Sequence, residues 1–135
     1  MKGIDLKLFW LVIITSFIGG YYLFDNKYNE YSNIITFLSI MIGFKITSLS
    51  ILFNSSLKQS LYDRKNSIYG TELHRLKDFY KHSLYFEVIS ISILFLIISD
   101  LKYIFIMPIL AGTIYCFYKT THELLKIFVY PTNEK

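Results

Sequence analysis

Four stretches of the chain are almost entirely apolar and are separated by polar segments. They cover residues 8–24, 33–53, 83–99 and 103–118. A transmembrane helix needs about 20 apolar residues in succession, so the first stretch, with 17, is slightly short. The second and third stretches each contain one charged residue, Lys45 and Glu87. This pattern predicts four membrane-spanning helices.

The polar segments indicate how the spans are connected. Residues 99–102 alone separate the last two spans, which predicts a tight antiparallel hairpin. Residues 54–82, between the second and third spans, form the one sizeable polar segment. There we expect Gly70 to interrupt the chain and Thr71 to cap a helix that runs unbroken into the third span. After the last span, residues 119–130 are expected to form an amphipathic helical tail.

The predicted fold is all-α, with a single membrane domain over residues 1–135. It is an integral membrane four-helix bundle with a helical extension between the second and third spans. The composition agrees, because 53% of residues are hydrophobic and 18% are charged, compared with about 25% charged residues in soluble domains. The single cysteine, Cys116, excludes a disulfide within the chain and fits a reducing compartment.

Spacings typical of catalytic, metal or cofactor sites do not occur in the sequence. His122 and Glu123 begin a zinc-protease-like motif, but Lys126 stands where the second histidine is required. Neither a Gly-rich phosphate loop nor the cysteine and histidine spacing of a zinc, haem or iron–sulfur site is present. We therefore expect a protein that is not an enzyme and that needs neither a cofactor nor a metal.

Positive charge is distributed unevenly between the two predicted sides of the membrane. Lysine and arginine accumulate in cytoplasmic segments because the translocation of positive charge is resisted. Eleven of them fall before the first span, within residues 54–82 or after the fourth span, against Lys27 and Lys102 in the other two connections. Both termini and segment 54–82 are therefore predicted to be cytoplasmic.

The second span carries small and polar residues along one face. They recur at intervals of three and four and so form one stripe on a helix: Thr36, Ser39, Gly43, Thr47, Ser50 and Asn54. At roughly 100° per residue, Lys45 lies about 180° from Thr36. Since both faces are poorly suited to lipid, we expect this span to be central, with protein or water on two sides. The stripe is either a helix-packing face within one bundle or the lining of a pore in a homo-oligomer.

A lysine inside a span requires a partner, a wet cavity or a route to the interface. Placing Lys45 at mid-span costs about 2.5–3.5 kcal/mol. Counted from the cytoplasmic ends of their spans, Lys45 and Glu87 differ in depth by ~6 Å, which a lysine stem can cover. The two residues are expected to form an intramembrane ion pair, which is either structural or a gate. The remaining alternative is that Lys45 extends to the interface.

Six basic residues lie within segment 54–82, against three acidic ones. They are Lys58, Arg64, Lys65, Arg75, Lys77 and Lys81. The orientation rule alone accounts for part of this excess. The alternative is a surface that binds an anionic nucleotide, an oligonucleotide or acidic lipid headgroups through their phosphates.

The order of elements is similar to that of a group of bacterial membrane proteins. Two crossings, a basic helical insert, two more crossings and a short tail, with the stretch SIMIGFKITSLSILF at 39–53, resemble small four-span proteins of bacterial anti-phage defence systems, of the Hailong and Kiwa types. This resemblance implies an oligomeric effector of the bacterial inner membrane that opens a pore or permeabilises the bilayer in abortive infection. It also implies control at the cytoplasmic face by a regulatory protein or a nucleotide signal, and it assigns a role to no individual residue.

Two other functions fit the same pattern. A non-conducting interaction protein, such as a bacteriocin immunity protein or a membrane anchor subunit, would use the stripe only for helix packing. A phage holin would share the small size and the positive charge.

Overall fold

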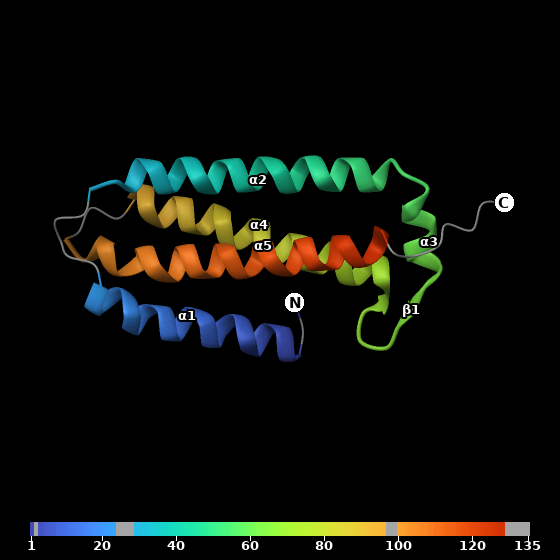
Figure 1. The fold of residues 1–135 in the computed structure, drawn as a ribbon, viewed down its shortest axis with the longest axis horizontal. Coiled ribbons are helices and arrows are strands. Elements are labelled where there is room, and N and C mark those ends of the chain that lie inside the picture. The colour runs from blue at the N-terminus through green and yellow to red at the C-terminus, as the bar shows by residue number, and fades with distance from the viewer. Residues whose placement is uncertain (2, 24–28, 97–99, 129–135) are drawn as a thin grey trace.

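Four long helices, with a short helix and a hairpin between the second and third of them, make up the structure. It is a computed structural model that describes residues 1, 3–23, 29–96 and 100–128 (Figure 1). The long helices are α1 (Ile4–Leu23), α2 (Tyr31–Phe53), α4 (Glu72–Leu96) and α5 (Ile106–Phe128). Between α2 and α4 lie α3 (Leu57–Asp63) and the antiparallel strands β1 (Lys65–Asn66) and β2 (Gly70–Thr71). A 3₁₀-helix, η1 (Asp100–Phe105), leads into α5.

The long helices confirm the all-α fold and the predicted number of candidate spans. Each is long and apolar enough to cross a membrane, over Ile4–Tyr22, Tyr31–Phe53, Glu72–Leu96 and Lys102–Lys126. The chain is therefore consistent with a multi-pass membrane protein, while its orientation stays a prediction from the charge distribution. Helix α1 begins before the predicted position 8 and includes Asp5 in its first turn, where a carboxylate is favourable to the helix dipole. Positions 24 and 97–99 of the predicted spans lie outside the described residues.

Helix α4 begins where the sequence predicts and runs without a break into the apolar region. The Thr71 hydroxyl oxygen accepts a hydrogen bond from the His74 backbone N–H at 3.2 Å, as an N-cap does. Just before it, Gly70 has a φ of +85°, which only glycine adopts without strain. Gly70 is the first residue of the second strand in a short hairpin whose strands have two residues each, and it pairs with Asn66. The sequence did not predict the hairpin or helix α3.

The last span and the predicted helical tail form one continuous helix. Helix α5 continues to Phe128, and positions 129 and 130 lie outside the described residues. The start of the predicted fourth span, 103–105, is 3₁₀-helical instead of α-helical. Pro108 lies in the first turn of α5, where its missing N–H is tolerated.

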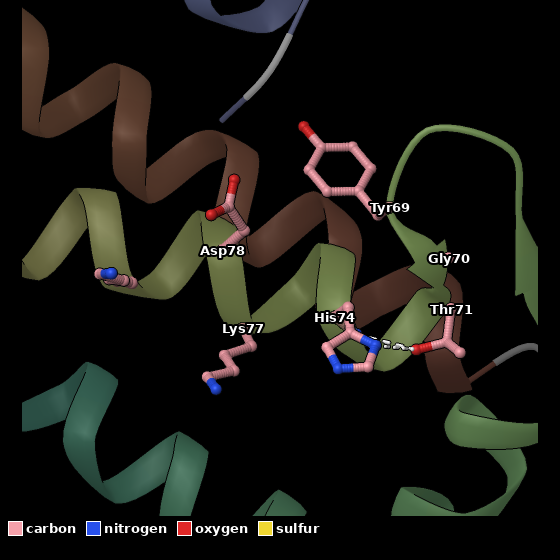
Figure 2. A pocket seen from close by; sticks show the side chains of 7 residues that line it. Tyr69, Gly70, Thr71, His74, Lys77 and Asp78 are labelled. Carbon is pink, nitrogen blue, oxygen red and sulfur yellow. Dashed lines mark hydrogen bonds between the residues drawn. The ribbon is translucent and has the colours of Figure 1, made fainter.

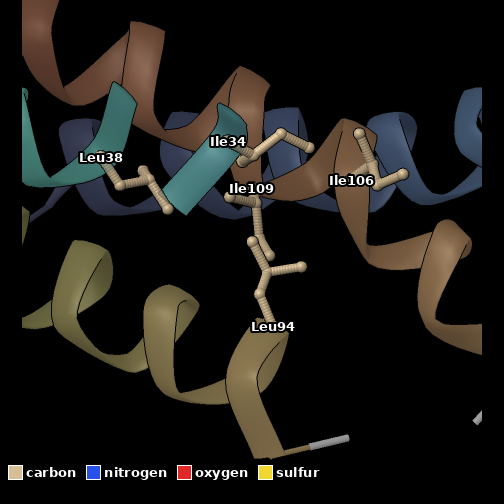
Figure 3. Packing of buried hydrophobic residues seen from close by; sticks show 5 residues of the cluster. All are labelled: Ile34, Leu38, Leu94, Ile106 and Ile109. Carbon is tan, nitrogen blue, oxygen red and sulfur yellow. The ribbon is translucent and has the colours of Figure 1, made fainter. Parts of the chain in front are cut away.

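The helices are arranged so that α4 and α5 lie between α1 on one side and α2 on the other (Figure 1). Near one end of the bundle, Ile34 and Leu38 of α2 pack against Leu94 of α4 and Ile109 of α5 (Figure 3). Toward the other end, Leu52 of α2 packs with α3 and α4 in a second apolar cluster. Within one chain α2 is therefore at an edge. This corrects the expectation of a central second span, because the chain covers only one of its two faces.

Two glycines allow α5 to contact its neighbours closely. A Cβ at Gly112 would overlap the Phe86 ring of α4 and would lie 2.7 Å from Ile13 Cδ1 of α1. A Cβ at Gly20 would lie 3.0 Å from the Ile104 carbonyl oxygen. Because neither position has room for a side chain, α1, α4 and α5 pack as one tight unit.

We expect Gly112→Val to destabilise the bundle by about 1–3 kcal/mol, because the added carbons force α1 and α4 away from α5. The measurement is chemical unfolding of the detergent-solubilised protein. Gly19→Val is the matched control, since no side-chain or distant backbone atom of the described residues lies within 4 Å of a Cβ built there. Equal stability of the two variants would contradict this account of the packing.

Candidate functional site

The centre of the α2–α4 contact is a buried ion pair. The Lys45 side chain is 1% exposed and Glu87 is 0% exposed. Lys45 Nζ donates hydrogen bonds to Glu87 Oε1 and to Ser83 Oγ. Ser83 and Glu87 are one helical turn apart and face α2 together, so α4 presents two oxygens to one ammonium group. The structure thus brings together the two residues that the sequence singled out.

The antiparallel packing of α2 on α4 explains why these residues meet. Leu52 of α2 contacts Leu76 and Tyr80, and Leu38 packs at the other end against Leu94. Lys45 lies midway between the two contacts, opposite Ser83 and Glu87. The apolar contacts at both ends therefore place the charged groups at the same depth.

A second carboxylate oxygen in this region lacks a partner. Among the described residues, Glu87 Oε2 and Thr113 Oγ1 are buried without a hydrogen bond. Arg75 pairs with Glu123 across the α4–α5 contact, and Phe86 meets Gly112, which places Thr113 at about the depth of Glu87. The interior of the bundle therefore holds more hydrogen-bonding capacity than its side chains use.

The predicted stripe on α2 lies on the uncovered side of the helix. Its six residues are all exposed: Thr36, Ser39, Gly43, Thr47, Ser50 and Asn54. The Thr36, Ser39 and Thr47 hydroxyls donate to backbone carbonyls four residues earlier, at 2.8–2.9 Å. These hydroxyls still have lone pairs that face outward. The stripe is thus a narrow, weakly polar surface without large side chains.

Ion pairs at one end of the bundle connect α1, α4 and α5. Lys119 Nζ lies 2.8 Å from Asp5 Oδ1, which connects α5 to α1. Arg75 Nη2 lies 2.8 Å from Glu123 Oε1, which connects α4 to α5. Lys45 is the one charged residue in the sequence of α2. Helix α2 is therefore held by apolar contacts, by the buried pair of Lys45 and Glu87, and by Lys102, whose Nζ lies 4.5 Å from the centre of the Tyr31 ring.

The six predicted basic residues do not form one surface. Arg75 is turned toward α5 and is paired with Glu72 and Glu123. Lys58 Nζ lies 5.6 Å from the centre of the Phe53 ring, at the α2–α3 junction. Lys65 is exposed on β1, and the Arg64 carbonyl accepts a hydrogen bond from the Glu72 N–H at 3.0 Å.

Lys77 and Lys81 do share a site, a pocket of about 510 Å³ beside the first turns of α4. Residues 69–71, His74 and Asp78 also line it (Figure 2). The sequence did not indicate His74, since a single histidine in a charged helix carries no motif. Its spacing of three residues from Lys77 and seven from Lys81 was the available signal, because these intervals place the three on one helix face.

Comparison of the chain with protein-family models, curated proteins and solved structures finds no match.

We expect Lys45→Met to lower the free energy of unfolding by about 3–5 kcal/mol, because it leaves the Glu87 carboxylate buried and unpaired. The double variant Lys45→Met/Glu87→Gln should recover a large part of this loss, since it removes both charges. Chemical unfolding in detergent measures both values. Lys119→Met breaks a partly exposed pair and should cost about 1 kcal/mol or less. A cost for Lys45→Met no larger than for Lys119→Met would show that the buried pair is unimportant.

Proposed function

We propose that this chain is an oligomeric membrane protein that forms a gated pore, lined by the exposed stripe of α2. The observation that carries the proposal is the position of this stripe. It is a continuous row of small and weakly polar residues, yet it faces away from the chain's own helices. Lipid offers no hydrogen bonds and gains nothing from small side chains, whereas another helix or water suits both.

The two faces of α2 support different roles. The inner face already buries its lysine against Glu87 and Ser83, so it needs no further partner. The outer face is narrow because Gly43 and small hydroxyl residues interrupt bulky side chains such as Phe44 and Ile46. Copies arranged around an axis would bring their stripes together, with these bulky neighbours closing the gaps between them.

The uneven attachment of the helices supports gating by α2. Helices α1, α4 and α5 are connected by ion pairs at one end, and Gly20 and Gly112 allow close packing. Helix α2 depends on the buried pair between Lys45 and Glu87. Separation of that pair would free α2 to shift or rotate while the other three helices stay together. In this proposal the pair stabilises the closed state.

A gated pore of this kind suits an effector of the bacterial inner membrane that acts in anti-phage defence, as the sequence resemblance implies. The cytoplasmic location of the basic pocket is part of the same proposal. A non-conducting protein that uses the stripe for packing is the alternative outcome of the experiments below.

We expect the purified protein in liposomes to conduct ions, and Gly43→Leu to abolish the flux by filling the stripe. Gly19→Leu is the matched control, because both glycines have open space at the Cβ position. Flux is read from the collapse of a potassium gradient, and the oligomeric state from chemical crosslinking in the liposomes. A monomer without flux would contradict the proposal.

Thr47→Val separates a pore lining from a packing face, because it keeps the side-chain shape and removes the hydroxyl. A stripe that faces water should lose conductance in this variant while the oligomer persists. If both the unaltered chain and Thr47→Val form oligomers that conduct no ions, the stripe serves packing and the pore is excluded.

We expect Lys45→Met/Glu87→Met to raise the open fraction of the pore, because the closed position of α2 loses its charged contact. The exchange Lys45→Glu/Glu87→Lys keeps opposite charges at the two positions and should conduct more like the unaltered chain. Single-channel recording measures the open fraction. An open fraction that is unchanged in the double methionine variant would contradict a gating role.

A further inference from the structure

The pocket beside α4 presents a row of nitrogen donors. We define the basic pocket by Thr71, His74, Lys77 and Lys81, which line it together with Asp78. His74, Lys77 and Lys81 are exposed and are spaced three and four residues apart along one face of the helix. From His74 to Lys81 the row is ~10 Å long at 1.5 Å per residue.

The acidic residue of the pocket does not cancel this charge. Figure 2 shows His74 and Lys77 on one side of α4, with the Asp78 carboxylate turned to the opposite side. There Asp78 Oδ2 contacts the amino group of Met1, and its Oδ1 lies 3.6 Å from His82 Nδ1. Asp78 therefore lines the pocket with a carboxylate that is already engaged by groups outside it.

His74 is held in a defined orientation. Its Nδ1 lies 2.8 Å from Thr71 Oγ1, and its backbone N–H donates to the same oxygen at 3.2 Å. In the tautomer in which the Thr71 hydroxyl donates to Nδ1, Nε2 carries the ring proton. An imidazole fixed in this way presents an N–H donor on the side of the ring away from Thr71.

We infer that the basic pocket binds a phosphate group through His74 Nε2–H and the ammonium groups of Lys77 and Lys81. A phosphate has several acceptor oxygens and a charge of up to −2, so three donors from one helix face can be satisfied at once. The ligand is a phosphomonoester, carried either by a lipid headgroup or by a soluble molecule.

The position of the pocket is compatible with both carriers. Lys81 Nζ lies 5.6 Å from the centre of the Tyr85 ring, close to the start of the predicted apolar part of α4 at Ser83. Interfacial tyrosines and lysines lie at headgroup depth. His74, about two turns further from the bilayer, remains open to soluble molecules.

Binding at this place would also reach α2. The Tyr62 ring of α3 lies 6.5 Å from the His74 ring, measured between centroids, and α3 follows α2 after three residues. A phosphate bound at His74 would act next to the Tyr62 ring, and so affect how α3 packs on α4 and, through α3, the end of α2. This effect on the pore rests on the proposed function, whereas phosphate binding itself does not.

The test is a titration of the detergent-solubilised protein with inorganic phosphate and then glycerol 3-phosphate, followed by NMR of the histidine Hε1 signals. We expect a saturable shift of the His74 signal, with His122 as the internal reference. Lys77→Gln/Lys81→Gln should weaken binding about tenfold or more, because two charge-assisted hydrogen bonds are lost. Lys7→Gln/Lys126→Gln removes the same charge outside the pocket and should leave the affinity unchanged.

A second arm uses nanodiscs of phosphatidylcholine with or without phosphatidic acid. A His74 shift that appears only with phosphatidic acid identifies a lipid carrier, and a shift with glycerol 3-phosphate alone identifies a soluble one. The inference is overturned if His74 does not respond in either arm, or if both double variants weaken binding equally. These results are independent of ion flux, so a chain that binds phosphate without conducting fails only as a pore, and one that conducts without binding fails only here.

Discussion

The ion pair between Lys45 and Glu87 is the constraint on which the arrangement of the helices depends. An isolated charge in this apolar interior would cost several kcal/mol, so α2 cannot slide or rotate on α4 without a large penalty. The apolar contacts of Leu52 and Leu38 at either end are made in the same register as the pair. The pair therefore contributes more to the specificity of packing than to net stability, since its own desolvation offsets much of the attraction.

Close packing in the rest of the bundle depends on two glycines, which have no side chain. Gly112 allows α5 to contact α1 and α4 at the same level, and Gly20 allows α1 to approach the Ile104 carbonyl. That carbonyl has no α-helical donor, because Pro108, four residues later, lacks an N–H. Close backbone packing and the ion pairs of Lys119 and Arg75 then make these three helices a unit from which α2 is distinct.

Features that depend on local sequence could be predicted, and features that depend on facing surfaces could not. The four candidate spans follow from apolar runs, and the start of α4 follows from Gly70 and Thr71, which act within one turn. The contact between Lys45 and Glu87 could be predicted from their similar depth in the predicted spans, because the spans contain no other charged residue that could pair with Lys45. The edge position of α2 depends on how α1 packs on α5 through Gly112 and Gly20. The polar groups on the two faces of α2, from which a central position was expected, carry no information about that packing.

The basic residues of segment 54–82 show the same limit. Sequence alone treats Arg75 and Lys77 as equivalent charges two residues apart. In the structure Arg75 faces α5 and is neutralised by Glu123, whereas Lys77 faces the basic pocket. Side chains of residues two positions apart on a helix point roughly 200° away from each other. Which of them has a structural role and which can bind a ligand therefore depends on where the neighbouring helix lies.

In the proposed pore, the separation of roles between the two faces of α2 would let one helix combine closure with conduction. A lysine in the pore lining would repel cations and hold water permanently, whereas a lysine on the inner face affects the pore only through the position of the helix. The stripe can then consist of groups that suit either protein or water, because the hydroxyls of Thr36, Ser39 and Thr47 are already bonded to their own backbone. Because the stripe has only a weak preference between protein and water, it can exchange one for the other at a low cost in free energy. In this proposal the strong electrostatic preference is kept at Lys45, where loss of the contacts with Glu87 and Ser83 would change the state of the helix.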